Sequence, residues 1–170
     1  MLLQLFTTLA AAQAGSAGPA AAAQTPSAVA ACASAEYHQF DFWAGHWDVY
    51  NKAGKLVAHS LIEPVYGCGI RENWMPLNNQ PGGSLSIYVP AEKRWEQFWI
   101  DSSGSRATFI GGWNGSAMVI TGKWGGPLIR MTYSKNADGS VRQFGEQSTD
   151  DGQTWKPSFD FTYRPSKASN

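Results

Sequence analysis

Polar and charged side chains stand two residues away from tryptophans in several short segments of the chain. Glu72 lies two residues before Trp74, and Gln97 and Asp101 lie on either side of Trp99. Residues i and i+2 share one face of a β-strand, so strands through these positions would place polar groups among large apolar ones. A third segment adds an arginine, and the candidate ligand-binding residues are Glu72, Trp74, Gln97, Trp99, Asp101 and Arg142.

Charged groups among large apolar neighbours either line a wet cavity or pair with one another, because burying an isolated charge is costly. A pocket with apolar walls and a few convergent polar groups is the usual form of a ligand site. In such a pocket Glu72, Asp101 and Arg142 could act in acid–base catalysis, but the sequence gives no geometry for it. The alternative is a solvent-facing side of the strands with interspersed aromatic residues.

Other chemical signatures are absent from the sequence, which has no G-x-S-x-G, P-loop or G-x-G-x-x-G motif. His38, His46 and His59 are not spaced for a zinc site. His46 and Asp48 would share a strand face and could bind a metal weakly, and His59 could serve as an axial haem ligand. Nothing around these residues favours either alternative, so we expect no metal, no cofactor and no catalytic residues.

Charge is balanced over the 170 residues, with 13 Lys and Arg against 13 Asp and Glu. This balance argues against a nucleic-acid partner, which usually requires a basic surface, and against polybasic membrane docking. Residues 1–35 carry no charged side chain. Their apolar start and small residues predict a signal peptide over 1–23, although no basic residue precedes the apolar run. A linker over 24–36 follows, and no transmembrane helix is expected.

The chain has two cysteines, Cys32 and Cys68. In an oxidising compartment they could form a disulfide that joins the start of the domain to an early strand. Two unrelated thiols are one alternative. A lipid anchor on Cys32 is another, but polar Gln24, Pro26 and Ser27 stand where the apolar core of such a signal is expected. The disulfide is the preferred interpretation, with a periplasmic or secreted protein as its consequence.

From residue 46 onward, short alternating segments are separated by turn residues, which predicts an all-β domain. Consecutive strands joined by short turns favour a closed up-and-down barrel, because closure removes exposed strand edges. Trp155, Phe159, Phe161 and Tyr163 are expected on one face of the last strand. The barrel domain is predicted over 37–165, with a tail over 166–170 and ten strands at 46–50, 55–65, 68–75, 84–89, 94–101, 105–113, 116–124, 128–134, 140–148 and 154–164.

Two turns have distinctive sequences. Asn114 and Gly115 are typical of a two-residue hairpin turn, since both residue types tolerate positive φ. Residues 148–155 fit S-x-D-x-G-x-T-W and resemble the Asp-box of sialidase-type propellers. A single copy predicts a hairpin turn in which the Asp side chain accepts backbone hydrogen bonds.

Residues 40–50 read Phe-Asp-Phe-Trp-Ala-Gly-His-Trp-Asp-Val-Tyr, an aromatic lead-in followed by a G-x-W motif. Together with residues 67–74 and 141–164, this pattern resembles an exported bacterial family of unknown function. The G-x-W motif also resembles that of the calycin superfamily, which includes the lipocalins. That resemblance implies a short helical turn before strand one and a barrel floor closed by Trp47 under a basic residue of the last strand, here Arg164.

We therefore expect an exported lipocalin-like barrel that binds a small apolar or amphipathic ligand. A structural or interaction domain with a filled core is the alternative, and an enzyme that uses the barrel as a reaction chamber is the third. Aromatic residues fill cores as readily as they line pockets, so the eight tryptophans do not decide between the first two.

Overall fold

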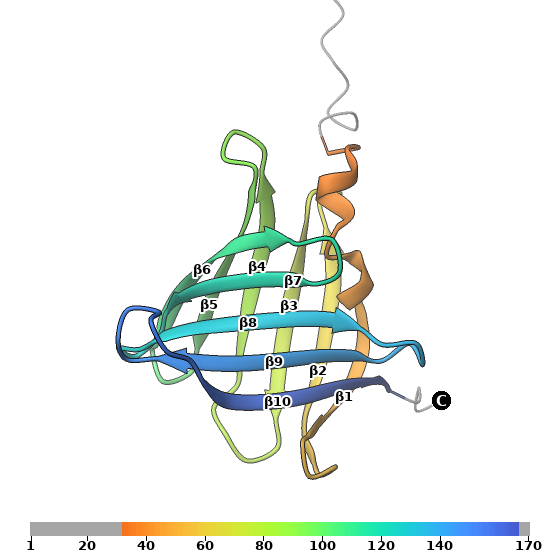
Figure 1. The fold of residues 1–170 in the computed structure, drawn as a ribbon. Helices are drawn as coiled ribbons and strands as arrows, with labels where there is room; N and C mark the ends of the chain where they lie inside the picture. Colours follow the sequence, from red (N-terminus) through yellow and green to blue (C-terminus); the bar gives the residue numbers. More distant parts are fainter. Residues whose placement is uncertain (1–31, 167–170) are drawn as a thin grey trace, which may run out of the picture.

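The structure, a computed structural model, describes residues 32–166. The expected leader (1–23), the first part of the expected linker (24–31) and residues 167–170 lie outside the described residues. Two 3₁₀ turns, η2 and η3, precede a closed barrel of ten strands (Figure 1). The elements are η2 Ala35–His38, η3 Asp41–Trp43, β1 Gly45–Asn51, β2 Leu56–Val65, β3 Gly69–Pro76, β4 Gly82–Val89, β5 Arg94–Asp101, β6 Arg106–Trp113, β7 Met118–Lys123, β8 Leu128–Lys135, β9 Val141–Ser148 and β10 Lys156–Pro165.

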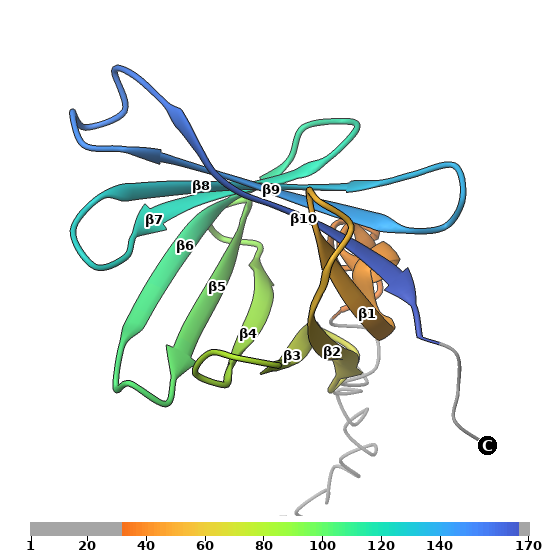
Figure 2. The same ribbon diagram turned by 90° about the horizontal axis from the view of Figure 1, so that it is seen from below.

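Each strand pairs antiparallel with the next along the chain, and β10 pairs with β1 to close the barrel (Figure 2). The predicted up-and-down barrel with a short helical turn before strand one is confirmed. Closure gives every strand two hydrogen-bonded neighbours, which removes exposed edges. The connections that lead from an odd-numbered strand to the following even-numbered strand, such as β1 to β2, lie at one end of the barrel, and η2 and η3 lie at the other (Figure 1). We call these the open end and the closed end.

Aromatic side chains fill the closed end. Phe40, just before η3, and Trp43, its last residue, are both fully buried, and their rings stack with centroids 5.0 Å apart. Trp43 also packs against Tyr133 of β8, with centroids 4.7 Å apart. The indole nitrogen of Trp47 donates a hydrogen bond of 2.9 Å to the backbone carbonyl of Trp43. The lead-in therefore acts as a plug that is part of the core.

A disulfide between Cys32 and Cys68 ties this plug to the barrel. Cys32 precedes η2, and Cys68 lies in the turn between β2 and β3. The predicted pairing is confirmed. The bond also uses the Cys32 sulfur atom that a lipid anchor would require, so the alternative of lipidation at Cys32 is wrong for this structure.

Arg164 does not cover Trp47 as the calycin resemblance implied. The register of β1 with β10 places Arg164 opposite Asp48, one residue out of phase with the buried Trp47. Arg164 therefore lies on the outer face, where its guanidinium sits 4.9 Å from the ring centre of Tyr50. Inside the barrel, Trp47 meets Tyr163 edge-on, with centroids 6.4 Å apart.

The turn between β9 and β10 has the predicted Asp-box geometry. Asp150 accepts hydrogen bonds from the Ser148 hydroxyl (2.6 Å) and from the Thr154 backbone amide (2.9 Å). These bonds, the one from Ser148 first, lower the pKa of Asp150 to about 2. Gly152 takes a φ of 90°, a conformation that a residue with a Cβ adopts only with strain.

Trp155 does not share a face with Phe159, contrary to expectation. A β-bulge between Pro157 and Phe159 shifts the register, so residues before it point the other way. The Trp155 ring lies under the guanidinium of Arg130, 4.1 Å from the ring centre, on the outer face. Its indole nitrogen donates to the carbonyl of Gly152 (3.0 Å), which fastens the turn.

The turn at Asn114 and Gly115 is longer than the predicted two-residue loop, because β7 begins only at Met118. The Asn114 side chain accepts hydrogen bonds from the backbone amides of Ser116 (3.0 Å) and Ala117 (2.9 Å). This side-chain turn replaces the expected tight hairpin.

Candidate functional site

Polar side chains occupy inward-facing positions halfway along the barrel, above the aromatic plug. They alternate along the strands with outward-facing residues, as the pleat requires. All of them are buried. We call this set the polar layer; it consists of Ser60, Glu72, Ser84, Ser86, Gln97, Tyr133, Gln143 and Tyr163.

A cavity of about 190 Å³ lies between the polar layer and the open end. Phe109 and Met131 contribute to its wall, and Asn79 reaches it from the turn between β3 and β4. Toward the open end the wall is aromatic, and we call these residues the aromatic rim: Trp74, Trp99, Trp124, Phe159 and Phe161. An apolar cavity of about 150 Å³ holds one benzene molecule, so this cavity has room for a compact ligand with one ring.

The rings of the aromatic rim contact one another around the cavity. Phe159 stacks on Phe161 with centroids 5.0 Å apart, and Phe161 lies 5.7 Å from Trp74. The position of Phe159 depends on Gly145 beneath it, since a Cβ at position 145 would overlap the Phe159 ring. Any larger residue there would force the ring to move.

Glu72 stands in the cavity wall on β3 as the only charged residue in the buried set of residues 32–166. Its carboxyl accepts hydrogen bonds from the hydroxyls of Ser84 (3.0 Å) and Ser60 (3.4 Å) on the two neighbouring strands. Burial raises the pKa of Glu72 to about 7, although the two serine bonds act in the opposite direction. The carboxyl therefore changes charge near neutral pH.

The amides of the polar layer are held by their neighbours. Tyr163 donates its hydroxyl to the Oε1 atom of Gln143 (2.7 Å), and the Nε2 atom of Gln143 donates to the Tyr133 hydroxyl (2.9 Å). Gln97 donates through Nε2 to the Ser86 hydroxyl (3.1 Å). Such fixed partners orient these groups before any ligand arrives.

Four of the six sequence-predicted candidates, Glu72, Trp74, Gln97 and Trp99, line this one cavity. Asp101 does not: its carboxylate accepts bonds from the Ser103 amide and hydroxyl in the turn after β5. It touches the site only indirectly, by accepting a bond from the Trp99 indole (3.3 Å).

Arg142 points to the outer face, so its predicted place in the pocket is wrong. Its guanidinium forms two hydrogen bonds with Asp160 (2.7 and 2.8 Å) on β10 and lies over Phe144. The polar residue that β9 contributes to the cavity is the next one, Gln143. Gln143 shares a strand face with Val141, which is apolar and fully buried. That spacing of two residues was the sequence signal that could have identified Gln143 as inward-facing.

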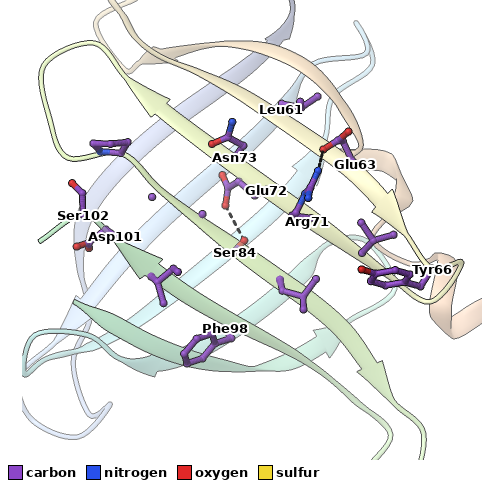
Figure 3. A pocket seen from close by; sticks show the side chains of 16 residues that line it. Leu61, Glu63, Tyr66, Arg71, Glu72, Asn73, Ser84, Phe98, Asp101 and Ser102 are labelled. Carbon is purple, nitrogen blue, oxygen red and sulfur yellow. Dashed lines mark hydrogen bonds and ion pairs between the residues drawn. The ribbon is translucent and has the colours of Figure 1, made fainter. Parts of the chain in front are cut away.

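A second hollow lies outside the barrel, a groove of about 920 Å³ across β2 to β5 (Figure 3). Leu85, Phe98 and Ile100 line it and are 49%, 45% and 55% exposed. The pair formed by Glu63 and Arg71 crosses its edge, whereas the carboxyl of Glu72 turns toward Ser84. The exposed charges of Glu63 and Arg71 pair with each other, and the carboxylate of Asp101 is held by the turn after β5, so the interior cavity is the better candidate site.

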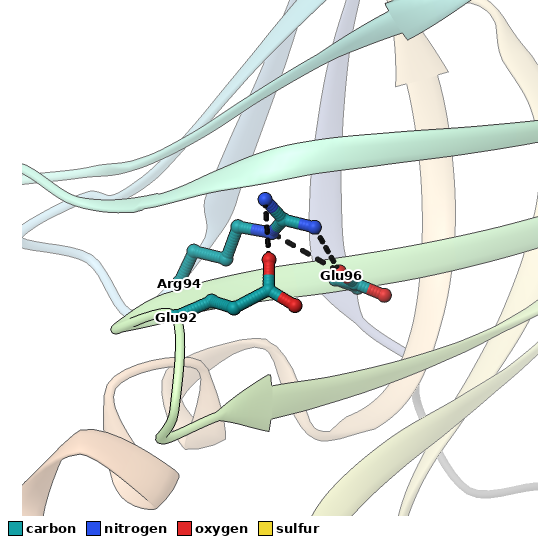
Figure 4. Close-up of polar contacts among 3 residues, drawn as sticks. All are labelled: Glu92, Arg94 and Glu96. Atoms are coloured by element: carbon teal, nitrogen blue, oxygen red, sulfur yellow. Dashed lines mark hydrogen bonds and ion pairs between the residues drawn. The ribbon is translucent and has the colours of Figure 1, made fainter.

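Another group of charges lies at the closed end of β5. Arg94 bridges Glu92 and Glu96, each at 2.6 Å (Figure 4). The three side chains are between a third and a half exposed, and such surface pairs contribute little to stability. They are therefore not a candidate site.

The haem alternative does not fit the barrel geometry. Within residues 32–166, no three His, Cys, Asp or Glu side chains are grouped to hold a metal ion. His59 lies on the outer face, with Nδ1 2.8 Å from a carboxylate oxygen of Asp48, and is about half exposed. It cannot reach a group inside the barrel. In the same part of the chain, no helix is long and apolar enough to cross a membrane.

Neither a scan of protein-family models nor a search of curated proteins finds a match to this chain. The site must therefore be interpreted from its own geometry.

The buried carboxyl makes stability depend on pH. A folded-state pKa of about 7 for Glu72, against 4.5 when unfolded, means that the folded protein holds a proton that the unfolded chain releases. The contribution of Glu72 to stability is then fully present below pH 4.5 and is lost as pH rises through 7. From pH 5 to pH 8 we expect Glu72 to cost about 2–3 kcal/mol of unfolding free energy.

Glu72→Gln should remove this dependence, because the amide can still bond both serines and does not ionise. Urea denaturation at pH 5 and pH 8 measures the effect as the difference between wild type and variant. Glu63→Gln is the matched control, since Glu63 is 40% exposed on the outer face. Parallel pH profiles for wild type and Glu72→Gln would show that the carboxyl is not titrating in this range.

Proposed function

We propose that this protein binds one small amphipathic ligand inside the barrel, entering from the open end. The observation that carries the proposal is the cavity itself, which combines an aromatic rim with a buried polar layer. Apolar walls with a few oriented polar groups are typical of ligand sites. A filled core would have left no such space. The cavity of about 190 Å³ is below the size of most drug-binding pockets, which limits the ligand to a compact molecule.

We also propose that the protein is exported and belongs to the exported bacterial family that its lead-in resembles. The disulfide supports export, because such bonds persist mainly in oxidising compartments. The barrel with its helical lead-in supports the lipocalin-like part of the resemblance. A periplasmic and a secreted location are both compatible with the disulfide.

Binding of 2-phenylethanol, a compact amphipathic probe, tests the proposed function. We expect one molecule to bind per chain by isothermal titration calorimetry. Gly145→Ala should weaken binding by about tenfold or more, because it pushes Phe159 into the cavity and removes room for the ring. Gly112→Ala is the matched control, since a Cβ there would meet nothing within 4 Å.

Equal affinities for wild type and Gly145→Ala would place the probe outside the barrel. Absence of binding to wild type, by this probe and by a charged analogue of the same shape, would contradict the proposal and favour a structural domain. The bound and free states can also be followed by the fluorescence of the rim tryptophans.

A further inference from the structure

The charge of Glu72 is not balanced inside the barrel. The cavity lining includes Glu72 but no lysine, arginine or histidine, and the ion pairs among residues 32–166 leave Glu72 out. Its partners are two neutral hydroxyls, Ser60 and Ser84. A buried carboxylate is normally paired with a cation, since hydrogen bonds alone only partly replace water.

The rings around the same cavity favour a cation as well. Trp74, Trp99 and Phe161 lie on strands β3, β5 and β10, and Trp124 contacts Trp99 with centroids 6.1 Å apart. The face of an aromatic ring is negative and attracts ammonium groups, and tryptophan does so most strongly. Aromatic walls next to a carboxylate therefore form a site for an organic cation.

We propose that the ligand of this cavity is a small organic ammonium compound whose positive group binds Glu72 and whose apolar body packs among the aromatic rim. This inference rests on the proposed function and specifies its ligand class. An anionic ligand would meet the Glu72 charge without a compensating cation in the cavity wall. An uncharged ligand would leave the carboxylate as poorly compensated as before.

Protonation of Glu72 gives the interaction a defined pH dependence. The titratable groups facing it are Tyr133 on β8 and Tyr163 on β10, and burial, reinforced by the Glu72 charge, raises the pKa of both hydroxyls. They stay neutral while Glu72 ionises, with a pKa of about 7. A primary ammonium, like lysine, keeps its proton to pH 8 and above. Ammonium affinity should therefore rise by about tenfold from pH 6 to pH 8.

The test compares 2-phenylethylammonium with 2-phenylethanol, which has the same shape and no charge. At pH 8 we expect wild type to bind the ammonium about thirtyfold tighter than the alcohol. In Glu72→Gln the ratio should fall to about threefold or less, because the amide keeps the shape but not the charge. Glu63→Gln, which removes a carboxylate from the outer face, should keep the wild-type ratio.

The outcomes separate this inference from the proposed function. If both probes bind wild type equally, or if the ratio survives in Glu72→Gln, the ammonium inference is overturned and the ligand-binding barrel stands. If neither probe binds wild type, both proposals fail. If Glu72→Gln still binds the alcohol, the variant barrel is intact. A fall in the ratio of ammonium to alcohol affinity then results from the lost charge.

Discussion

Replacing Trp43 with alanine is expected to lower the free energy of unfolding by about 3–5 kcal/mol. The indole is fully buried and contacts Phe40, Tyr133 and Tyr163 in the plug of the closed end. Its removal leaves a cavity that these rings cannot fill without moving, and the loss of transfer free energy adds to the cost of that cavity. Urea denaturation followed by far-ultraviolet circular dichroism measures the change.

Trp43→Phe is the control for this experiment. The indole nitrogen of Trp43 is the one buried side-chain nitrogen or oxygen without a hydrogen-bond partner in residues 32–166. Phenylalanine removes this unpartnered donor, whose burial costs about 1–3 kcal/mol, and keeps an aromatic ring in place. We expect a much smaller loss than for alanine. If phenylalanine and alanine are equally destabilising, the indole nitrogen has a partner and the packing argument fails.

Loss of the disulfide between Cys32 and Cys68 is expected to cost about 3–4 kcal/mol. The bond joins residues separated by 36 positions, and it restricts the unfolded chain more than the folded one. The double variant Cys32→Ser, Cys68→Ser should therefore unfold at lower urea concentration than oxidised wild type.

Reduced wild type is the matched comparison for the double variant. Dithiothreitol should lower the stability of wild type to that of the variant and leave the variant unchanged. A variant as stable as oxidised wild type would show that the plug holds its place through aromatic packing alone.

The fold could be predicted from the sequence because its signals are local. Strand segments alternate in hydropathy, and turn residues separate them, so each strand could be recognised without its partners. The turn at Asp150 was also predictable, since its hydrogen bonds all lie within residues 148–155. Strand boundaries differ from the prediction where side-chain hydrogen bonds lengthen a turn, as at Asn114.

The site could be predicted only in part, because alternation identifies two faces and does not say which is inside. Trp74 and Trp99 are large enough to indicate the inward face, and Glu72 and Gln97 share it. On β9 the aromatic residue that shares a face with Arg142 is Phe144, two positions later, and this face is the outer one. The same reasoning therefore assigned Arg142 to the interior, which is wrong.

Two other predictions, the positions of Arg164 and Trp155, were wrong because they depend on how strands pair. The position of Arg164 depends on the register of β1 with β10, and that of Trp155 depends on a bulge between Pro157 and Phe159. Register and bulges are set by contacts between distant parts of the chain. They carry no local signature that a single sequence reveals.

A substitution at Gly145, the glycine beneath Phe159, would change the size of ligand that the proposed cavity can hold. A Cβ at position 145 would overlap the Phe159 ring, which lines the cavity, so the residue at that position affects where the ring can lie. A single added methyl group would exclude bulkier guests while leaving the carboxyl of Glu72 and its serine partners untouched. In the proposed ligand site, the size limit and the charge would thus be set by different residues, so that one could change without the other.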